Sequence, residues 1–131
     1  MKRWSFTIYG NQEAIKGNAI PKLRMTQRGL WTKQAKRYRA WAEFIRVAWY
    51  EAFAPPKKRN DEQKKPYSKL FNGRMDIVIY WANEKHGDAE GIFGSIADAL
   101  FENDKHLDGS FVTIHKDKEN PRVEVVIHSS E

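Results

Sequence analysis

Two acidic residues, Asp88 and Glu90, stand two positions apart in the segment HGDAEGIFGSIADALFENDKHL, which covers residues 86–107. In an extended turn this spacing points both side chains to the same side of the backbone. Asp98 follows in the same segment, and Asp104 comes near its end. Mg²⁺ prefers carboxylate oxygens, and two or three convergent carboxylates suffice because the ion keeps several of its waters. The segment therefore predicts a magnesium site that acts at a phosphate.

A structural interpretation of Asp88 and Glu90 is equally open. Acidic side chains at the first turn of a helix accept hydrogen bonds from free backbone N–H groups, and their charge interacts favourably with the helix dipole by ~0.3–1 kcal/mol. Grouped carboxylates repel one another unless a cation relieves them. From the residues alone, metal binding and helix capping remain two explanations of the same pair.

The charge of the chain is unevenly distributed. The net charge is +6, but segment 84–108 contains seven acidic residues and two lysines and carries −5, so the rest of the chain carries +11. A basic surface attracts a polyanion such as DNA. An ordinary surface with uneven charge is the alternative. The candidates for phosphate contacts are Lys22, Arg24, Arg28, Lys36, Arg37 and Arg39.

The composition limits the class of protein. A chain of 131 residues is long enough for one domain with a core of its own. It has no cysteine, which excludes disulfides and thiolate zinc sites. Its N-terminal segment does not read as a signal peptide, and no stretch approaches the ~18–20 apolar residues of a membrane span. We therefore expect a soluble, cytoplasmic protein without a membrane partner.

Hydropathy patterns predict the elements that must position these residues. Alternating apolar residues predict strands over 4–9 and 73–82, and two further strands over 111–115 and 122–128 are joined by a polar turn at 117–120. Apolar residues at helical spacing predict helices over 32–53 and 92–102. Tyr38 and Trp41 lie on the apolar stripe of the first helix and are expected in the core, which leaves Trp31 as the aromatic candidate for a DNA contact.

Two segments show neither periodicity. Residues 17–31 predict a basic loop, and the lysine-rich stretch at about 55–69 predicts a mobile basic loop. The order of the remaining elements predicts the α+β class. We expect a single domain over residues 1–131, with a mixed, mostly antiparallel sheet packed by two helices.

The segment after residue 86 resembles the signature of the RusA family of Holliday-junction resolvases. The family motif D-x-D-N stands here as DAEG at 88–91, and the D-A-L of the next helix stands at 98–100. An acidic residue follows at ND, 103–104, and a P-R-x-E-like strand at PRVE, 121–124. This sequence departs from the motif at three positions: Glu90 replaces an aspartate, Gly91 an asparagine and Gly94 a lysine.

The resemblance implies roles for particular residues. Asp88, Glu90 and Asp104 would hold one or two Mg²⁺ ions. Gly94 stands where the family has a lysine, and either Lys105 takes the place of that lysine or the activity is reduced or lost. Apart from the resemblance, His86 lies two residues before Asp88 and either orients a ligand, contacts phosphate or is a solvated turn residue. The remaining candidates near this site are Asp98 and, as the alternative third carboxylate, Asp108.

The resemblance also implies a substrate and an assembly. The expected activity is the Mg²⁺-dependent hydrolysis of phosphodiester bonds in branched DNA, a four-way junction above all, during recombination and repair. The expected active form is a homodimer, because a four-way junction is roughly two-fold symmetric and needs paired nicks. The alternative is a catalytically inactive RusA-like protein that still binds nucleic acid.

Overall fold

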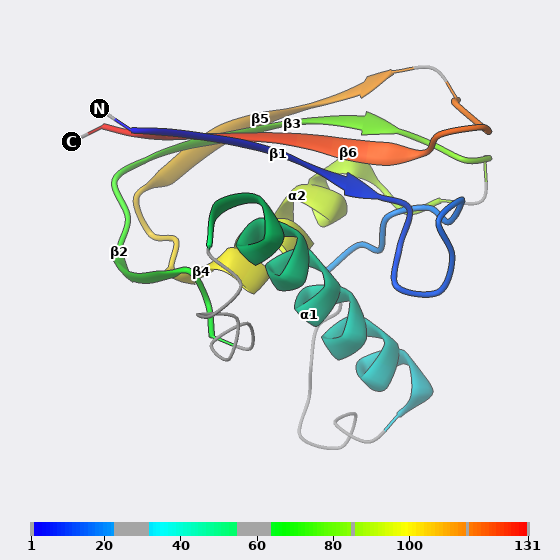
Figure 1. Cartoon of the computed structure of the whole chain (residues 1–131), viewed down its shortest axis with the longest axis horizontal. Coiled ribbons are helices and arrows are strands. Elements are labelled where there is room, and N and C mark those ends of the chain that lie inside the picture. Colours follow the sequence, from blue (N-terminus) through cyan, green and yellow to red (C-terminus); the bar gives the residue numbers. More distant parts are fainter. Residues whose placement is uncertain (1, 23–31, 55–63, 85, 115, 131) are drawn as a thin grey trace.

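One four-stranded sheet and two helices form the main layers of the protein (Figure 1). The structure is a computed structural model, and it describes residues 2–22, 32–54, 64–84, 86–114 and 116–130. In chain order the elements are β1 (Arg3–Tyr9), α1 (Lys33–Phe53), β2 (Tyr67–Leu70), β3 (Gly73–Tyr80), α2 (Ala89–Leu100), β4 (Phe101–Asn103), β5 (Leu107–Ile114) and β6 (Arg122–Ser129).

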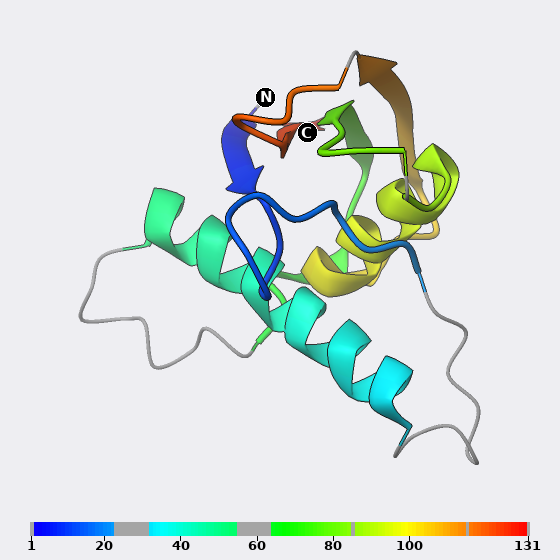
Figure 2. The same ribbon diagram turned by 90° about the vertical axis from the view of Figure 1, so that its right-hand side faces the viewer.

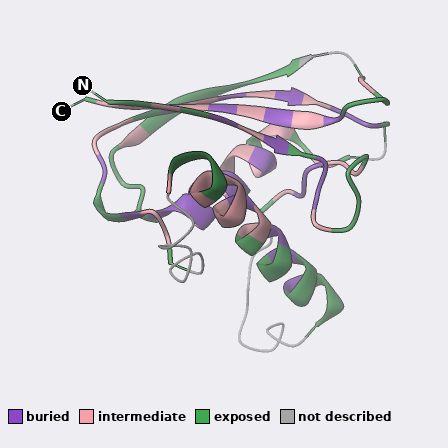
Figure 3. Cartoon of the chain, viewed as in Figure 1, coloured by how far each residue is buried: buried purple, intermediate pink, exposed green. Residues whose placement is uncertain are grey.

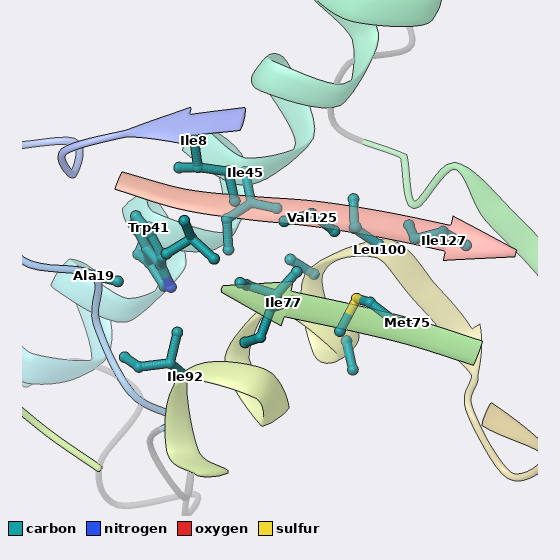
Figure 4. Close-up of a cluster of buried hydrophobic side chains, with 14 of the residues drawn as sticks. Ile8, Ala19, Trp41, Ile45, Met75, Ile77, Ile92, Leu100, Val125 and Ile127 are labelled. Carbon is teal, nitrogen blue, oxygen red and sulfur yellow. The ribbon is translucent and has the colours of Figure 1, made fainter. Parts of the chain in front are cut away.

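The core lies between the sheet and the helices. Alternation along β3 and β6 places every second side chain on the face that the helices cover, so Met75, Ile77 and Val125 are fully buried there. Figure 4 shows these side chains meeting Trp41 and Ile45 of α1. The expected core positions Tyr38 and Trp41 are both buried. The predicted α+β class and single domain are confirmed.

The strand order is β1-β6-β3-β5. β6 is antiparallel to both β1 and β3, whereas β5 runs parallel to β3. The two C-terminal strands therefore do not pair with each other, although they follow one another in the sequence. The physical reason is the crossover: α2 connects β3 to β5, and a strand–helix–strand connection makes the two strands parallel. β6 then pairs with the other edge of β3.

The expected mobile loop at about 55–69 is wrong for its second half. Residues 55–63 lie outside the described residues, but Tyr67–Leu70 forms β2, which pairs in parallel with β4. Tyr67 is buried, its ring stacks on Phe101 at a centroid distance of 4.5 Å, and its hydroxyl accepts a hydrogen bond from Trp49 Nε1 at 3.1 Å. Aromatic packing thus holds this segment against α1 and β4.

α1 extends beyond the layer that it covers. Its cap is Thr32, whose side chain accepts the N–H of Ala35 at 3.1 Å. The N-terminal half of the helix projects away from the sheet in both ribbon views (Figures 1 and 2), and Figure 3 shows that most of its surface is exposed. No helix within the described ranges is long and apolar enough to cross a membrane.

Candidate functional site

Asp88 and Glu90 lie together at the start of α2. Asp88 is the N-cap residue, and its Oδ1 accepts the N–H of Gly91 at 2.5 Å. Glu90 is in the first turn, and both side chains are exposed. The capping role of Asp88 is therefore confirmed. The expected extended turn is wrong at this point, because residue 90 lies in the helix, where side chains two positions apart do not face each other. The cap uses one oxygen of Asp88 and leaves the other carboxylate oxygen exposed.

Lys22 is held against the same end of α2. Its backbone N–H donates to the carbonyl oxygen of Gly91 at 2.8 Å. A Cβ placed on Gly91 would lie 2.8 Å from Pro21 Cβ, and one placed on Gly94 would lie 3.4 Å from Lys22 Cδ. Gly91 thus lets segment 20–22 lie directly on the helix, and the stem of Lys22 lies alongside position 94. The backbone of Lys22 is thus fixed at the first turn of α2, and its side chain runs beside position 94.

Asp104 and Lys105 lie far from this point, in the turn between β4 and β5. The turn is fixed locally, because Asn103 Oδ1 accepts the N–H of Lys105 at 3.2 Å and the carbonyl oxygen of Asp104 accepts the N–H of Leu107 at 3.0 Å. The 12 residues of α2 separate Asp104 from Asp88 by a helix of about 18 Å. Lys105 shares this location, so it cannot replace a lysine at position 94 within one chain.

The register of the sheet gives the same separation. Leu107 pairs with Gly73 at the start of β3, whereas Asp88 follows the other end of that strand at Tyr80. Eight strand residues span roughly 25 Å. The alternative carboxylate, Asp108, is opposite Arg74 in the same register and is therefore equally distant.

The expected convergence of three carboxylates is not found within one chain. Among the residues that the structure describes, no group of three or more His, Cys, Asp or Glu side chains could hold a metal ion. Asp104 is close to Asp88 and Glu90 in the sequence but not in space. The helix between them keeps its two ends apart. After Leu100 the chain continues into β4 instead of turning back towards Asp88.

Asp98 joins the two helices. Its Oδ2 accepts a hydrogen bond from the hydroxyl of Tyr38 at 3.0 Å. Burial and the neighbouring Asp98 charge raise the pKa of Tyr38 above its usual value, so the phenol remains a neutral donor. One turn before Asp98 in α2, the hydroxyl of the fully buried Ser95 accepts a hydrogen bond from Trp41 Nε1 at 3.0 Å. These two bonds set the position of α2, and with it the position of Asp88.

His86 stacks on a tryptophan that the sequence did not single out. Its ring lies parallel to Trp81, with centroids 3.7 Å apart and an interplanar angle of 9°. Its Nδ1 lies 2.7 Å from the carbonyl oxygen of Gly87. Because a carbonyl only accepts hydrogen bonds, this nitrogen carries the proton. The exposed His86 ring is therefore oriented two residues before Asp88.

The basic candidates on α1 lie on its projecting half. Lys36, Arg37 and Arg39 are exposed, and Arg37 Nε donates to Glu13 Oε1 at 2.5 Å. This hydrogen bond and the Arg37 charge lower the pKa of Glu13. Arg37 is thus already paired with a carboxylate, whereas Lys36 and Arg39 have no ion pair within the described ranges. The candidates Arg24 and Arg28, like Trp31, lie outside the described residues.

No protein-family model matches the chain, and no curated protein matches its sequence. The resemblance to RusA-type resolvases therefore rests on the motif residues alone.

Proposed function

We propose that the protein is a Mg²⁺-dependent endodeoxyribonuclease that acts on branched DNA, as RusA-type resolvases do. The observation that carries the proposal is the arrangement at the start of α2. Two exposed carboxylates, Asp88 and Glu90, occupy the cap and first turn, and Lys22 is hydrogen-bonded against the same turn. A nuclease needs hard oxygen ligands for a cation and a positive charge for phosphate, and the first turns of α2 and the segment packed on them supply residues of both kinds.

The donor set fits Mg²⁺ through two carboxylates. Magnesium sites in proteins often use one or two carboxylates, with water and substrate phosphate completing the coordination. When bound, the ion would activate a water and stabilise charge on the scissile phosphate. The chain's own part is to fix the carboxylates: Asp88 is held by its bond to Gly91, and the exposed Glu90 is carried on the first turn of a helix tied to α1. Lys22 would contact a phosphate from the side.

The third carboxylate requires a second chain. Asp104 lies beyond the far end of α2, so it joins Asp88 and Glu90 only if it comes from another copy. In a homodimer with two-fold symmetry, each chain would give its α2 start to one site and its Asp104 turn to the other. We propose this homodimer as the active form, with paired sites that suit paired nicks in a four-way junction.

A nicking assay tests the proposal. A labelled synthetic four-way junction is incubated with the protein and Mg²⁺, with EDTA in a parallel reaction. We expect paired nicks that EDTA abolishes and that Glu90→Gln reduces by a factor of 10² or more, since the metal would lose a charged ligand. Glu51→Gln, an exposed carboxylate near the end of α1, is the matched control and should cut normally. Unchanged cutting by Glu90→Gln would contradict the assignment.

A second function, binding without catalysis, is favoured by two observations. The three carboxylates do not converge within one chain, and Gly91 and Gly94 replace two polar residues of the family motif. A protein of this kind would bind the junction tightly and salt-dependently but leave it uncut at every Mg²⁺ concentration. The same assay, read with a binding measurement in EDTA, separates the two functions.

A further inference from the structure

A charged hollow lies between the two helices and the chain that leads into β2. It has a volume of about 470 Å³. Its cationic side chains are Arg39 and Arg46 from α1 and Lys65, two residues before β2. Two carboxylates, Glu43 and Asp98, also line it. The hollow therefore gathers three positive charges and two negative ones from segments that are far apart in the sequence.

The three cations are not used by the fold as ion pairs. Within the described ranges, Arg39, Arg46 and Lys65 form no ion pair, although Glu43 is one helical turn from both arginines. Asp98 accepts a hydrogen bond from the hydroxyl of Tyr38, and this bond connects α2 to α1. Like charges facing one hollow repel one another, and an anion between them would relieve that repulsion.

Arg46 is anchored at only part of its guanidinium group. Its Nη1 donates to the carbonyl oxygen of Ala99 at 3.3 Å. Its Nε is buried and has no acceptor among the described residues. Buried donors in proteins are nearly always paired, and an exception calls for an ion, a water or a ligand. A small shift of the guanidinium towards an anion in the hollow would supply that acceptor.

The hollow continues a basic path on the same face. A second hollow, of about 210 Å³, is lined by Lys22 and Arg37 and shares Tyr38 with the first. Arg37 is paired with Glu13, so Lys22 is the cation of this second hollow that has no ion pair among the described residues. Cations thus stand on both sides of Tyr38, which suits a chain of phosphates better than one isolated anion. The planar fork of an arginine matches phosphate oxygens, and a lysine adds a point charge.

We infer that the hollow formed by Arg39, Arg46 and Lys65 binds a backbone phosphate of the nucleic acid, away from the Asp88 end of α2. This inference rests on the proposed nucleic-acid substrate but not on cleavage. Arg46 and Lys65 would contact this phosphate, and the negative charge of Glu43 would weaken its binding. Removing the Glu43 charge should therefore strengthen binding.

The test measures binding in EDTA, where no cutting occurs. The fluorescence anisotropy of a labelled four-way junction is followed over a salt series for the wild type and for Arg39→Gln/Lys65→Gln. Both side chains are outside the core, so the double variant should fold, which thermal unfolding checks. The slope of log K against log salt is negative, and loss of one phosphate contact should make it less negative by about 0.9 on duplex arms. Lys118→Gln, in the exposed turn before β6, is the control and should keep the wild-type slope.

Two further arms decide the ligand. Glu43→Gln should tighten junction binding by about two- to fivefold at low salt. Titration with inorganic phosphate should give only weak binding. Saturable phosphate binding that Arg46→Gln removes, with an unchanged junction slope, would assign the hollow to a free phosphate and overturn the backbone assignment. An unchanged slope together with no phosphate binding overturns the site altogether.

The proposed nuclease activity and the inferred phosphate site can be refuted independently of each other. A junction that is bound with the expected slopes but never cut leaves this site standing and removes the nuclease. A wild type that shows no salt-dependent junction binding removes the nucleic-acid substrate and the backbone assignment together.

Discussion

Replacing Asp88 by two different residues separates its two roles. Asparagine caps a helix as well as aspartate does, so Asp88→Asn keeps the bond to the Gly91 N–H and loses only the charge. Asp88→Ala loses the cap as well. If the residue also holds a cation at a scissile phosphate, both variants should lose nicking to the same extent, while only alanine should weaken the fold substantially.

The expected loss of stability follows from the capping bond. Removing an N-cap side chain costs about 1 kcal/mol, within a range of roughly 0.5–2 kcal/mol. At about 2.1 cal/mol/K per residue, the unfolding entropy of a chain of 131 residues is roughly 275 cal/mol/K near the midpoint. Asp88→Ala should therefore lower the Tm by about 4 °C. Asp88→Asn loses a few tenths of a kcal/mol of interaction with the helix dipole, or roughly 1–2 °C.

The assays are thermal unfolding and junction nicking on the same preparations. An active Asp88→Asn variant would show that the carboxylate is only a cap and would refute the metal role. A Tm for Asp88→Ala equal to that of the wild type would refute the capping account. Loss of nicking in both variants, with the stability difference as calculated, supports both roles at once.

Three other predictions concern the assembly, the helix contact and the acid range. Mixing Asp88→Asn with Asp104→Asn protein should restore nicking at roughly a quarter of the sites, because each mixed dimer rebuilds one shared site; no recovery would exclude sharing. Ser95→Ala leaves the Trp41 Nε1 donor buried without its acceptor and should cost about 1–3 kcal/mol in chemical denaturation. The Arg74 and Ser110 hydrogen bonds lower the pKa of Asp76 below 3.8, so its stabilisation is present above that pH and is lost as pH falls through the folded-state pKa. Asp76→Asn should therefore lose less stability than the wild type on acidification from pH 5 to pH 2.5, measured by urea unfolding.

Local patterns in the sequence predict the elements but not their pairing. The strand at β3 and the long helix α1 follow from the spacing of residues such as Ile77, Trp41 and Ile45, because burial on one side imposes that spacing. The strand order depends on a crossover that no local pattern encodes. β2 escaped prediction because its neighbours are lysines and a proline, while its anchor, Tyr67, is buried by aromatic rings from distant segments.

The same limit applies to the candidate site. Asp88 and Glu90 could be recognised because two residues next to a helix start remain neighbours in space. Asp104 could not be placed in this way, since sequence spacing does not show whether a chain turns back after a helix. The stacking of His86 on Trp81 and the bond between Tyr38 and Asp98 likewise join residues whose proximity depends on the packing of whole elements.

Position 94 shows how such packing changes the meaning of a departure from a motif. In the sequence, Gly94 stands at the position where the RusA resemblance leads one to expect a lysine. In the fold, the stem of Lys22 lies in van der Waals contact with the space that a side chain at position 94 would enter. A Cβ at position 94 would touch the Lys22 stem at an ordinary contact distance, so the lysine of another segment already lies on α2 beside this position. Loss of activity therefore cannot be argued from Gly94 alone; it has to be argued from whether Lys22 is dispensable.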